Sequence, residues 1–335
     1  MSDRVTLPEV AQLAGVSIAT VSRVLNGLPA KDDTRSRVLA AVAQLDYVAD
    51  SNARSLRAGQ SDQIAYAVPD VGNPIYVKMM HAVEKVVSQS GRRLVLSSIG
   101  SDPDALVDLV RSLNRGYADG LVLTPLRVNA ELIAALRDSR LPIAVVGTIP
   151  DDLAIDSVRA DSRAGIRLAV DHLRSKGRQS IAYIGGPADT GPGAARLAGY
   201  LEATQFDAEI ANPELLVEAR DFTHKAGEVA AEALLAQSTP DAIICANDLL
   251  AVGALRHLRK RGVSVPDDIA LIGVDDTDAA RLANPSLTSV KLRSARRARV
   301  AAELLMARIA DRGRPVQHLV IEPGLAIRES TGGPS

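Results

Sequence analysis

Four polar side chains that could hold a small molecule follow closely on short apolar segments of the chain. They are Asp70, Asn73, Asn247 and Asp275. In an open α/β sheet the parallel strands end at one edge, and ligands bind in the crevice outside that edge. Carboxylate and amide oxygens at such a place accept hydrogen bonds from ligand hydroxyl groups. The placement of these four residues predicts a ligand site at the strand ends.

The histidines and the single cysteine carry no pattern typical of an enzyme or a metal site. The five histidines lack the H-x-x-x-H spacing or a similar one. Cys245 has apolar neighbours and no group that would stabilise a thiolate, and Gly185-Gly186-Pro187 does not match a phosphate-binding loop. We therefore expect a protein that is not an enzyme, binds no metal and needs no cofactor, with Cys245 in its core.

The elements that position these side chains alternate along the chain from residue 64 onward. Apolar segments typical of strands lie at residues 64–68, 92–97, 120–124, 143–146, 181–184, 242–245 and 269–272. Helical segments begin near residues 75, 103 and 129 and extend over residues 162–176, 193–204, 223–237 and 249–261. Such alternation is typical of parallel sheets covered on both faces. It predicts an α/β fold with two sheets in tandem, two lobes and a cleft between them.

A segment with a helical pattern of apolar residues precedes the strands. Thr6-Leu7-Pro8-Glu9 is a capping box that starts a helix, Gly15 allows a tight turn, and Ser17 caps a second helix. The apolar positions of both helices fall on one face. This pattern predicts a helix-turn-helix, which places the start of its second helix in the DNA major groove.

The segment from Leu7 to Gly27, followed by Thr34-Arg35, Val38, Leu45 and Tyr47, resembles the headpiece of the LacI/GalR (lactose-repressor) family almost position by position. The resemblance continues through Ile327. It implies an N-terminal helix-turn-helix headpiece and a two-lobed, periplasmic-binding-protein-like sensor with parallel sheets. It divides the chain into a headpiece at residues 1–50, a hinge helix and linker at 51–62, and a ligand-binding and dimerisation domain at 63–335.

The resemblance also implies which residues contact DNA. They are Thr6, Leu7, Ser17, Ile18, Ala19, Thr20, Ser22, Arg23, Asn26, Thr34, Asn52, Ala53, Leu56 and Arg57. Ile18 and Ala19 occupy the two specificity positions of the family, where apolar side chains can touch thymine methyl groups but cannot form bidentate hydrogen bonds. Arg23 is then expected to read a guanine, and Leu56 of the hinge is expected to wedge between central base pairs.

In the sensor, the resemblance implies a pocket whose residues come from both lobes. They are Asp70, Asn73, Tyr76, Arg196, Phe222, Asn247 and Asp275. Arg196 offers a planar fork of donors, and Phe222 can stack against the apolar face of a sugar ring. A sugar is therefore the leading ligand class. A purine is the alternative, disfavoured by the loop at residues 189–193 and by a chain with two phenylalanines and no tryptophan.

Three neighbours of these residues are expected to have structural roles. Asp248 is expected to be a helix N-cap, Asp276 an exposed turn residue, and Tyr200 a core aromatic.

The remaining expectations concern partners and location. The net charge of −1 indicates that any nucleic-acid contact is local. No apolar run is long enough to span a bilayer, and residues 1–14 lack an export signal, so we expect no membrane, a cytoplasmic location, and not a transporter-type solute-binding protein. The short recognition helix implies a homodimer on near-palindromic, double-stranded operator DNA. Among sugar-responsive relatives, release from DNA by the effector is favoured over corepression.

Overall fold

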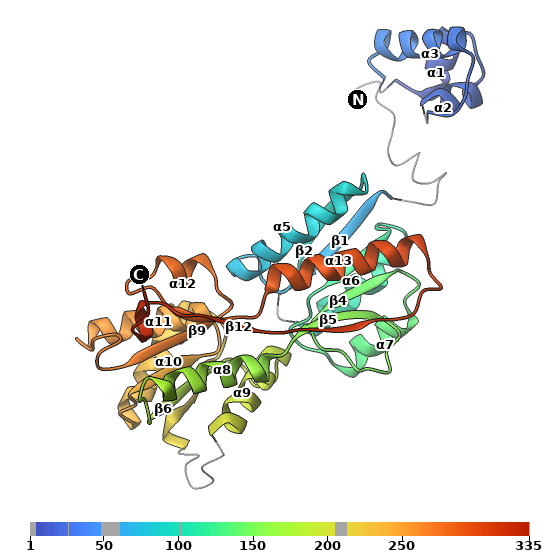
Figure 1. Ribbon diagram of the computed structural model, residues 1–335. Coiled ribbons are helices and arrows are strands. Elements are labelled where there is room, and N and C mark those ends of the chain that lie inside the picture. Colours follow the sequence, from blue (N-terminus) through green and yellow to red (C-terminus); the bar gives the residue numbers. More distant parts are fainter. Residues whose placement is uncertain (1–4, 26, 48–60, 101, 205–212, 335) are drawn as a thin grey trace. The chain divides into compact units, whose positions relative to one another are not determined.

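The structure is a computed structural model that describes residues 5–25, 27–47, 61–100, 102–204 and 213–334 (Figure 1). The chain forms two compact units, Met1–Ser61 and Asp62–Ser335. Each unit is described by itself below.

The smaller unit is a three-helix headpiece. Its helices are α1 (Leu7–Ala14), α2 (Ile18–Leu25) and α3 (Asp32–Gln44). Val10, Val21 and Val38 contribute one fully buried side chain from each helix, so the three helices share one small core. Gly15 connects α1 to α2 with φ 61°, a left-handed conformation that glycine adopts without a steric penalty. The predicted helix-turn-helix is thereby confirmed.

The larger unit contains two six-stranded sheets. The first sheet has the order β11-β5-β4-β3-β1-β2, and all of its strand pairs are parallel. Its strands are β1 (Gln63–Val68), β2 (Arg93–Ser98), β3 (Gly120–Leu123), β4 (Ile143–Val146), β5 (Asp156–Ala160) and β11 (His318–Ile321). The helices packed in this lobe are α5 (Pro74–Gln89), α6 (Pro103–Leu113), α7 (Ala130–Asp138) and α13 (Ser294–Ala310).

The two faces of the first sheet bury alternate residues of the same strand. Ile64, Tyr66 and Val68 of β1 pack in one cluster with residues of α5 and α13. Ala65 and Ala67 pack in the other cluster with residues of α6 and α7. Because successive strand residues point to opposite faces, a strand that is buried on both faces is apolar throughout. This explains why the sequence shows a continuous apolar run here.

The second sheet has the order β12-β10-β9-β8-β6-β7, with β12 antiparallel to β10 and the other pairs parallel. Its strands are β6 (Ile181–Gly185), β7 (Leu216–Glu218), β8 (Ala242–Cys245), β9 (Ala270–Val274), β10 (Thr288–Lys291) and β12 (Gly324–Ala326). The helices of this lobe are α8 (Ser162–Ser175), α9 (Gly191–Thr204), α10 (His224–Gln237), α11 (Asp248–Lys260) and α12 (Asp278–Leu282), with short 3-10 turns at Pro213–Leu215 and Glu329–Thr331.

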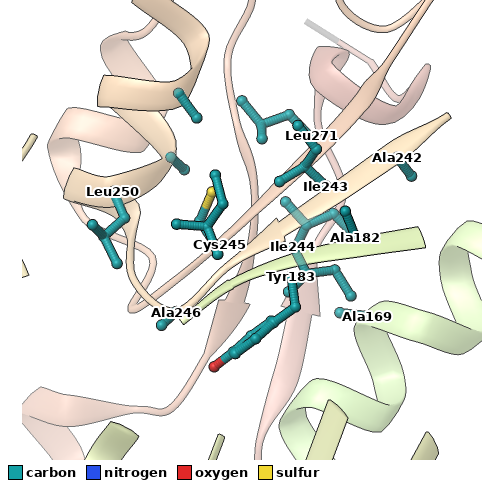
Figure 2. Close-up of a cluster of buried hydrophobic side chains, with 14 of the residues drawn as sticks. Ala169, Ala182, Tyr183, Ala242, Ile243, Ile244, Cys245, Ala246, Leu250 and Leu271 are labelled. Atoms are coloured by element: carbon teal, nitrogen blue, oxygen red, sulfur yellow. The ribbon is translucent and has the colours of Figure 1, made fainter. Parts of the chain in front are cut away.

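One apolar cluster forms the core of the second lobe. Figure 2 shows part of it, with Tyr183 of β6 and Cys245 of the neighbouring β8. Cys245 is fully buried, as predicted, and burial raises the pKa of its thiol. Tyr200 is also a core aromatic, as predicted: its ring stacks on Tyr183 at a centroid distance of 4.9 Å, and its hydroxyl donates to the Ile181 carbonyl at 2.9 Å.

The prediction of two lobes in tandem is wrong in its connectivity. After β10 of the second sheet, α13 returns to the first lobe and packs against α5, and β11 then joins the edge of the first sheet (Figure 1). The chain finally crosses back to form β12. Strands β11 and β12 are short and only partly buried, so they lack the continuous apolar run that marks a central strand. The chain therefore crosses three times between the two lobes.

Candidate functional site

The beginning of α2 presents a small exposed surface. Ser17, Ala19 and Arg23 are exposed, and Ile18 keeps 43% of its surface open to solvent. Val21, on the opposite face, is fully buried. An apolar side chain that the headpiece leaves unpacked is available to contact a partner, and an α-helix of this kind fits the width of the DNA major groove.

Local hydrogen bonds fix the beginnings of α1 and α2. Glu9 accepts from the Thr6 amide at 2.7 Å and from the Thr6 hydroxyl at 2.8 Å, and these bonds lower the pKa of Glu9. Ser17 accepts from the Thr20 amide at 3.2 Å, and the two hydroxyls lie 2.9 Å apart. The recognition helix therefore begins at a defined residue.

The other predicted DNA-contacting residues are only partly described. Thr6 is exposed, and Ser22 and Thr34 are partly buried. Leu7 packs against the headpiece core. Asn26 and the hinge residues lie outside the described residues, so their contacts stay predictions: Asn52, Ala53, Leu56 and Arg57.

In the larger unit, a cavity of about 120 Å³ opens where strands of both sheets end. Six of the seven predicted ligand residues line it: Asn73, Tyr76, Arg196, Phe222, Asn247 and Asp275. Asp70 is not among the lining residues. Its side chain is exposed and accepts from the Gly72 amide at 2.7 Å, which shapes the turn after β1. The remaining lining residues include Thr124, Arg159, Ser162 and Arg297.

Arg196 and Asp275 form a buried ion pair in the cavity wall. The Arg196 Nη2 lies 3.4 Å from Asp275 Oδ1, and the two side chains are 9% and 7% exposed. Arg196 Nη1 donates to the Ala246 carbonyl at 2.6 Å, while its buried Nε has no hydrogen-bond partner among the residues that the structure describes. Burial raises the pKa of Asp275, against the opposing charges of Arg196, Arg297 and Lys78. A polar ligand could accept the hydrogen bond that Nε leaves unused, because buried donors are costly when unpaired.

Asn247 caps helix α11 and also lines the cavity. Its Oδ1 accepts from the Leu250 amide at 2.8 Å and caps α11, and its Nδ2 donates to the Phe222 carbonyl at 3.1 Å. Each polar atom keeps one further hydrogen-bonding position, because an amide oxygen accepts two bonds and an amide nitrogen donates two. The bond to the Phe222 carbonyl also fixes the segment that carries the aromatic ring at the cavity wall.

Asp248 and Asp276 do not have the roles expected from the sequence. The N-cap of α11 is Asn247, and Asp248 is a buried acceptor for the Thr277 amide, the Thr277 hydroxyl and the Ser289 hydroxyl. Burial, together with the charge of Asp275, raises the pKa of Asp248 to about 7. The predicted cap was one residue off because Asn and Asp are both common N-caps.

The expectation of an exposed Asp276 is wrong. This residue is 8% exposed and pairs with Arg281 at 3.1 Å and with Arg328. Lys78 of the first lobe donates to its carbonyl at 3.1 Å. Along the chain, Arg281 is 5 residues and Arg328 is 52 residues away from Asp276. Only folding of the chain brings Arg328 close. These contacts with Arg281, Arg328 and Lys78 fix the turn after β9.

Arg297 is a cavity residue that the sequence analysis missed. It lies in the first turn of α13, and its Nε donates to the Leu292 carbonyl at 2.9 Å. Burial lowers the pKa of its guanidinium to about 10. A signal was present, because Arg296 and Arg297 stand with no acidic residue in the first helical turn, where acidic side chains are normally favoured.

In the described part of the chain, no helix is long and apolar enough to cross a bilayer.

Comparisons with known proteins agree with this architecture. Residues 6–50 match the family model "Bacterial regulatory proteins, lacI family", and residues 170–331 match a periplasmic-binding-protein-like domain. The ribose operon repressor of Haemophilus influenzae is 32% identical over 97% of this chain and 98% of its own length. The transcriptional repressor PurR of Aliivibrio fischeri strain ES114 is 31% identical over 97% of this chain and 98% of its own length.

Two solved structures also resemble the chain along almost its whole length. A complex of the transcriptional regulator CelR with cellobiose has a TM-score of 0.74 and 33% identity, covering 98% of this chain and 100% of that one. A lac repressor dimer bound to operator and the anti-inducer ONPF has a TM-score of 0.88 and 27% identity, covering 98% and 99%. These relatives are regulators of transcription rather than enzymes. The chain therefore belongs to the LacI family of bacterial regulatory proteins, and it is a DNA-binding transcription regulator.

Proposed function

We propose that this regulator represses genes of sugar utilisation, binds a near-palindromic operator as a cytoplasmic homodimer, and leaves the DNA when a small polyhydroxylated molecule fills the cavity. The observation that carries the effector proposal is the Arg196–Asp275 pair beside Asn247, which offers fixed donors and acceptors in a walled cavity. Ligand sites typically combine an apolar wall with a few placed polar groups. The relatives support the proposal, because they include a ribose operon repressor, a cellobiose complex and an operator-bound dimer.

The proposed coupling runs through contacts that both lobes make around the cavity. Asn73 and Tyr76 line it from the first lobe, whereas Asn247 and Asp275 line it from the second. Lys78 already bonds the Asp276 carbonyl across the lobes. A ligand that touches both sets of residues favours one arrangement of the lobes over another. Because coupling is reciprocal, operator DNA should weaken effector binding by about 1 to 3 kcal/mol, as in typical allosteric proteins.

A planar nucleobase is the second candidate ligand, as a corepressor. Two aromatic side chains, Tyr76 and Phe222, line the cavity, one from each lobe. Flat aromatic rings of this kind stack on planar heterocycles. A nucleobase that tightens operator binding would replace the sugar in the proposal and reverse the sense of regulation.

A screen of ligands by thermal unfolding tests the effector proposal. Monosaccharides, disaccharides, phosphorylated sugars and nucleobases are each added to the full-length protein. A ligand present at 100 times its dissociation constant should add about 2.7 kcal/mol to the free energy of unfolding. The same ligand should release a fluorescent operator fragment. A protein that is stabilised by no sugar of any kind would overturn the proposal.

The Arg23→Ala variant tests the proposed reading of DNA. We expect a loss of about 1 to 3 kcal/mol of operator affinity and relaxed selection at one base pair in each half-site. The Ser17→Ala variant should instead weaken binding to all sequences evenly. Both affinities are measured at one salt concentration, because phosphate contacts depend strongly on salt. Equal losses of Arg23→Ala on operator and on random DNA would contradict the assignment.

A further inference from the structure

The cavity wall carries an excess of positive charge. Its charged lining residues are Arg159, Arg196, Arg297 and Asp275, and it contains no lysine or glutamate among the described residues. Three positive charges and one negative charge give the wall a net charge of +2. The whole protein, by contrast, has a formal net charge of −1. The positive charge is therefore a local property of the cavity.

The single carboxylate in the wall is already engaged. Asp275 Oδ1 lies 3.4 Å from Arg196, and no other ion pair involves Asp275 in the part of the chain that the structure describes. Arg159, which is exposed, and Arg297, which is partly buried, form no ion pair there either, and the hydrogen bond that Arg297 makes to a protein group runs from Nε to a carbonyl. Buried charges are normally paired, since an unpaired charge loses hydration without compensation. The terminal nitrogens of Arg297 are therefore available to bind an anionic group in the cavity.

The backbone around Arg297 increases this preference for an anion. Arg297 lies in the first turn of the 17-residue helix α13, which has no acidic residue there. The first turn of a helix has a partial positive charge and unpaired amide groups, so it attracts anions and repels a cation. An arginine at this position is electrostatically unfavourable for the empty protein. The buried Nε of Arg196, which has no partner in the described part of the chain, adds a second unused donor in the same wall.

We propose that the effector is an anionic sugar, one that carries a carboxylate or a phosphate group, and that Arg297 binds this group while Arg196, Asn247 and Asp275 bind the hydroxyls. The inference rests on the proposed function, since it assumes that the cavity takes a polyhydroxylated ligand. An arginine guanidinium can hold either group with two parallel hydrogen bonds. The two sources of negative charge are separated by the choice of ligands below.

Calorimetric titrations of matched sugars test the inference. The sets are D-glucose, D-gluconate and D-glucose 6-phosphate; D-ribose and D-ribose 5-phosphate; and D-galactose and D-galacturonate. Inorganic phosphate alone is the control for charge without a sugar. The protein is full length, either unchanged or with Arg297→Gln. The matched control is Arg296→Gln, because Arg296 is the exposed neighbour in the same helical turn and does not line the cavity. Thermal unfolding of each variant shows whether its larger unit is folded.

We expect one anionic sugar to bind at least about ten-fold more tightly than its neutral parent, because a hydrogen bond to a charged group is stronger than a neutral one. This preference should be lost in Arg297→Gln, kept in Arg296→Gln, and weakened by added salt. A carboxylate sugar or a phosphate sugar as the tighter ligand identifies the anionic group.

Three results would overturn the inference. The first is a neutral parent sugar that binds as tightly as its anionic partner. The second is a preference for the anionic sugar that survives Arg297→Gln. Either result contradicts the role of Arg297 but leaves the proposed function intact. The third is inorganic phosphate that binds as tightly as a sugar phosphate, which would indicate a simple anion site. Binding of no sugar at all would instead refute the proposed function, and the inference with it.

Discussion

Replacing Asp275 by alanine is expected to lower the free energy of unfolding of the larger unit by about 3 to 5 kcal/mol, the usual cost of removing one member of a buried ion pair. The reason is that Arg196, with a side chain only 9% exposed, would remain charged without its carboxylate. The variant should also lose effector binding while it still binds operator. Urea unfolding and effector-induced operator release measure the two effects.

A second substitution distinguishes the effect of an unpaired charge on stability from the loss of ligand binding. In the double variant Asp275→Ala and Arg196→Met, neither charge of this pair remains, so most of the lost stability should return. Effector binding should stay lost, because both side chains that bind the ligand have been removed. Asp70→Ala is the control, since Asp70 is exposed and does not line the cavity. An Asp275→Ala protein that still releases operator with the same ligand would show that the effector site lies elsewhere.

The Gly253→Ala substitution is expected to destabilise the second lobe by about 3 kcal/mol or more, because overpacking against backbone has no flexible side chain to relieve it. A Cβ atom at Gly253 of α11 would lie 2.0 Å from the His224 carbonyl oxygen and 2.7 Å from the Glu228 amide nitrogen of α10. Gly227 faces the same problem, with a Cβ 2.3 Å from the Leu250 carbonyl oxygen. The two helices touch through backbone, so they must move apart.

Thermal and urea unfolding of Gly253→Ala and Gly227→Ala measure this cost. Gly313→Ala is the matched control, because a Cβ there would meet only the Asp311 side chain, at 3.4 Å. The control should unfold within about 0.5 kcal/mol of the unchanged protein, as most surface substitutions do. Normal stability of both helix variants would mean that α10 and α11 are not packed this closely.

The sequence alone determined the features that depend on neighbouring residues. The headpiece was predictable because the capping box, Gly15 and the apolar face of two helices are local signals. The central strands were predictable because strands buried on both faces, such as β3 and β8, are apolar throughout. Six of the seven ligand residues that the family resemblance implied line the cavity. Asn73, Asn247 and Asp275 follow parallel strands, whose ends lie at one edge of each sheet.

Only the tertiary structure decided the features that join distant parts of the chain. The return of α13 and β11 to the first lobe brings Arg297 to the cavity, and nothing in the residues around it states which lobe that helix joins. In the same way, Asp276 is buried because Arg328, 52 residues away, pairs with it. Charge pairing and burial are set by the surroundings in space, and a linear pattern carries only the period of a helix or strand. The positive charge of the cavity is therefore a property of the fold.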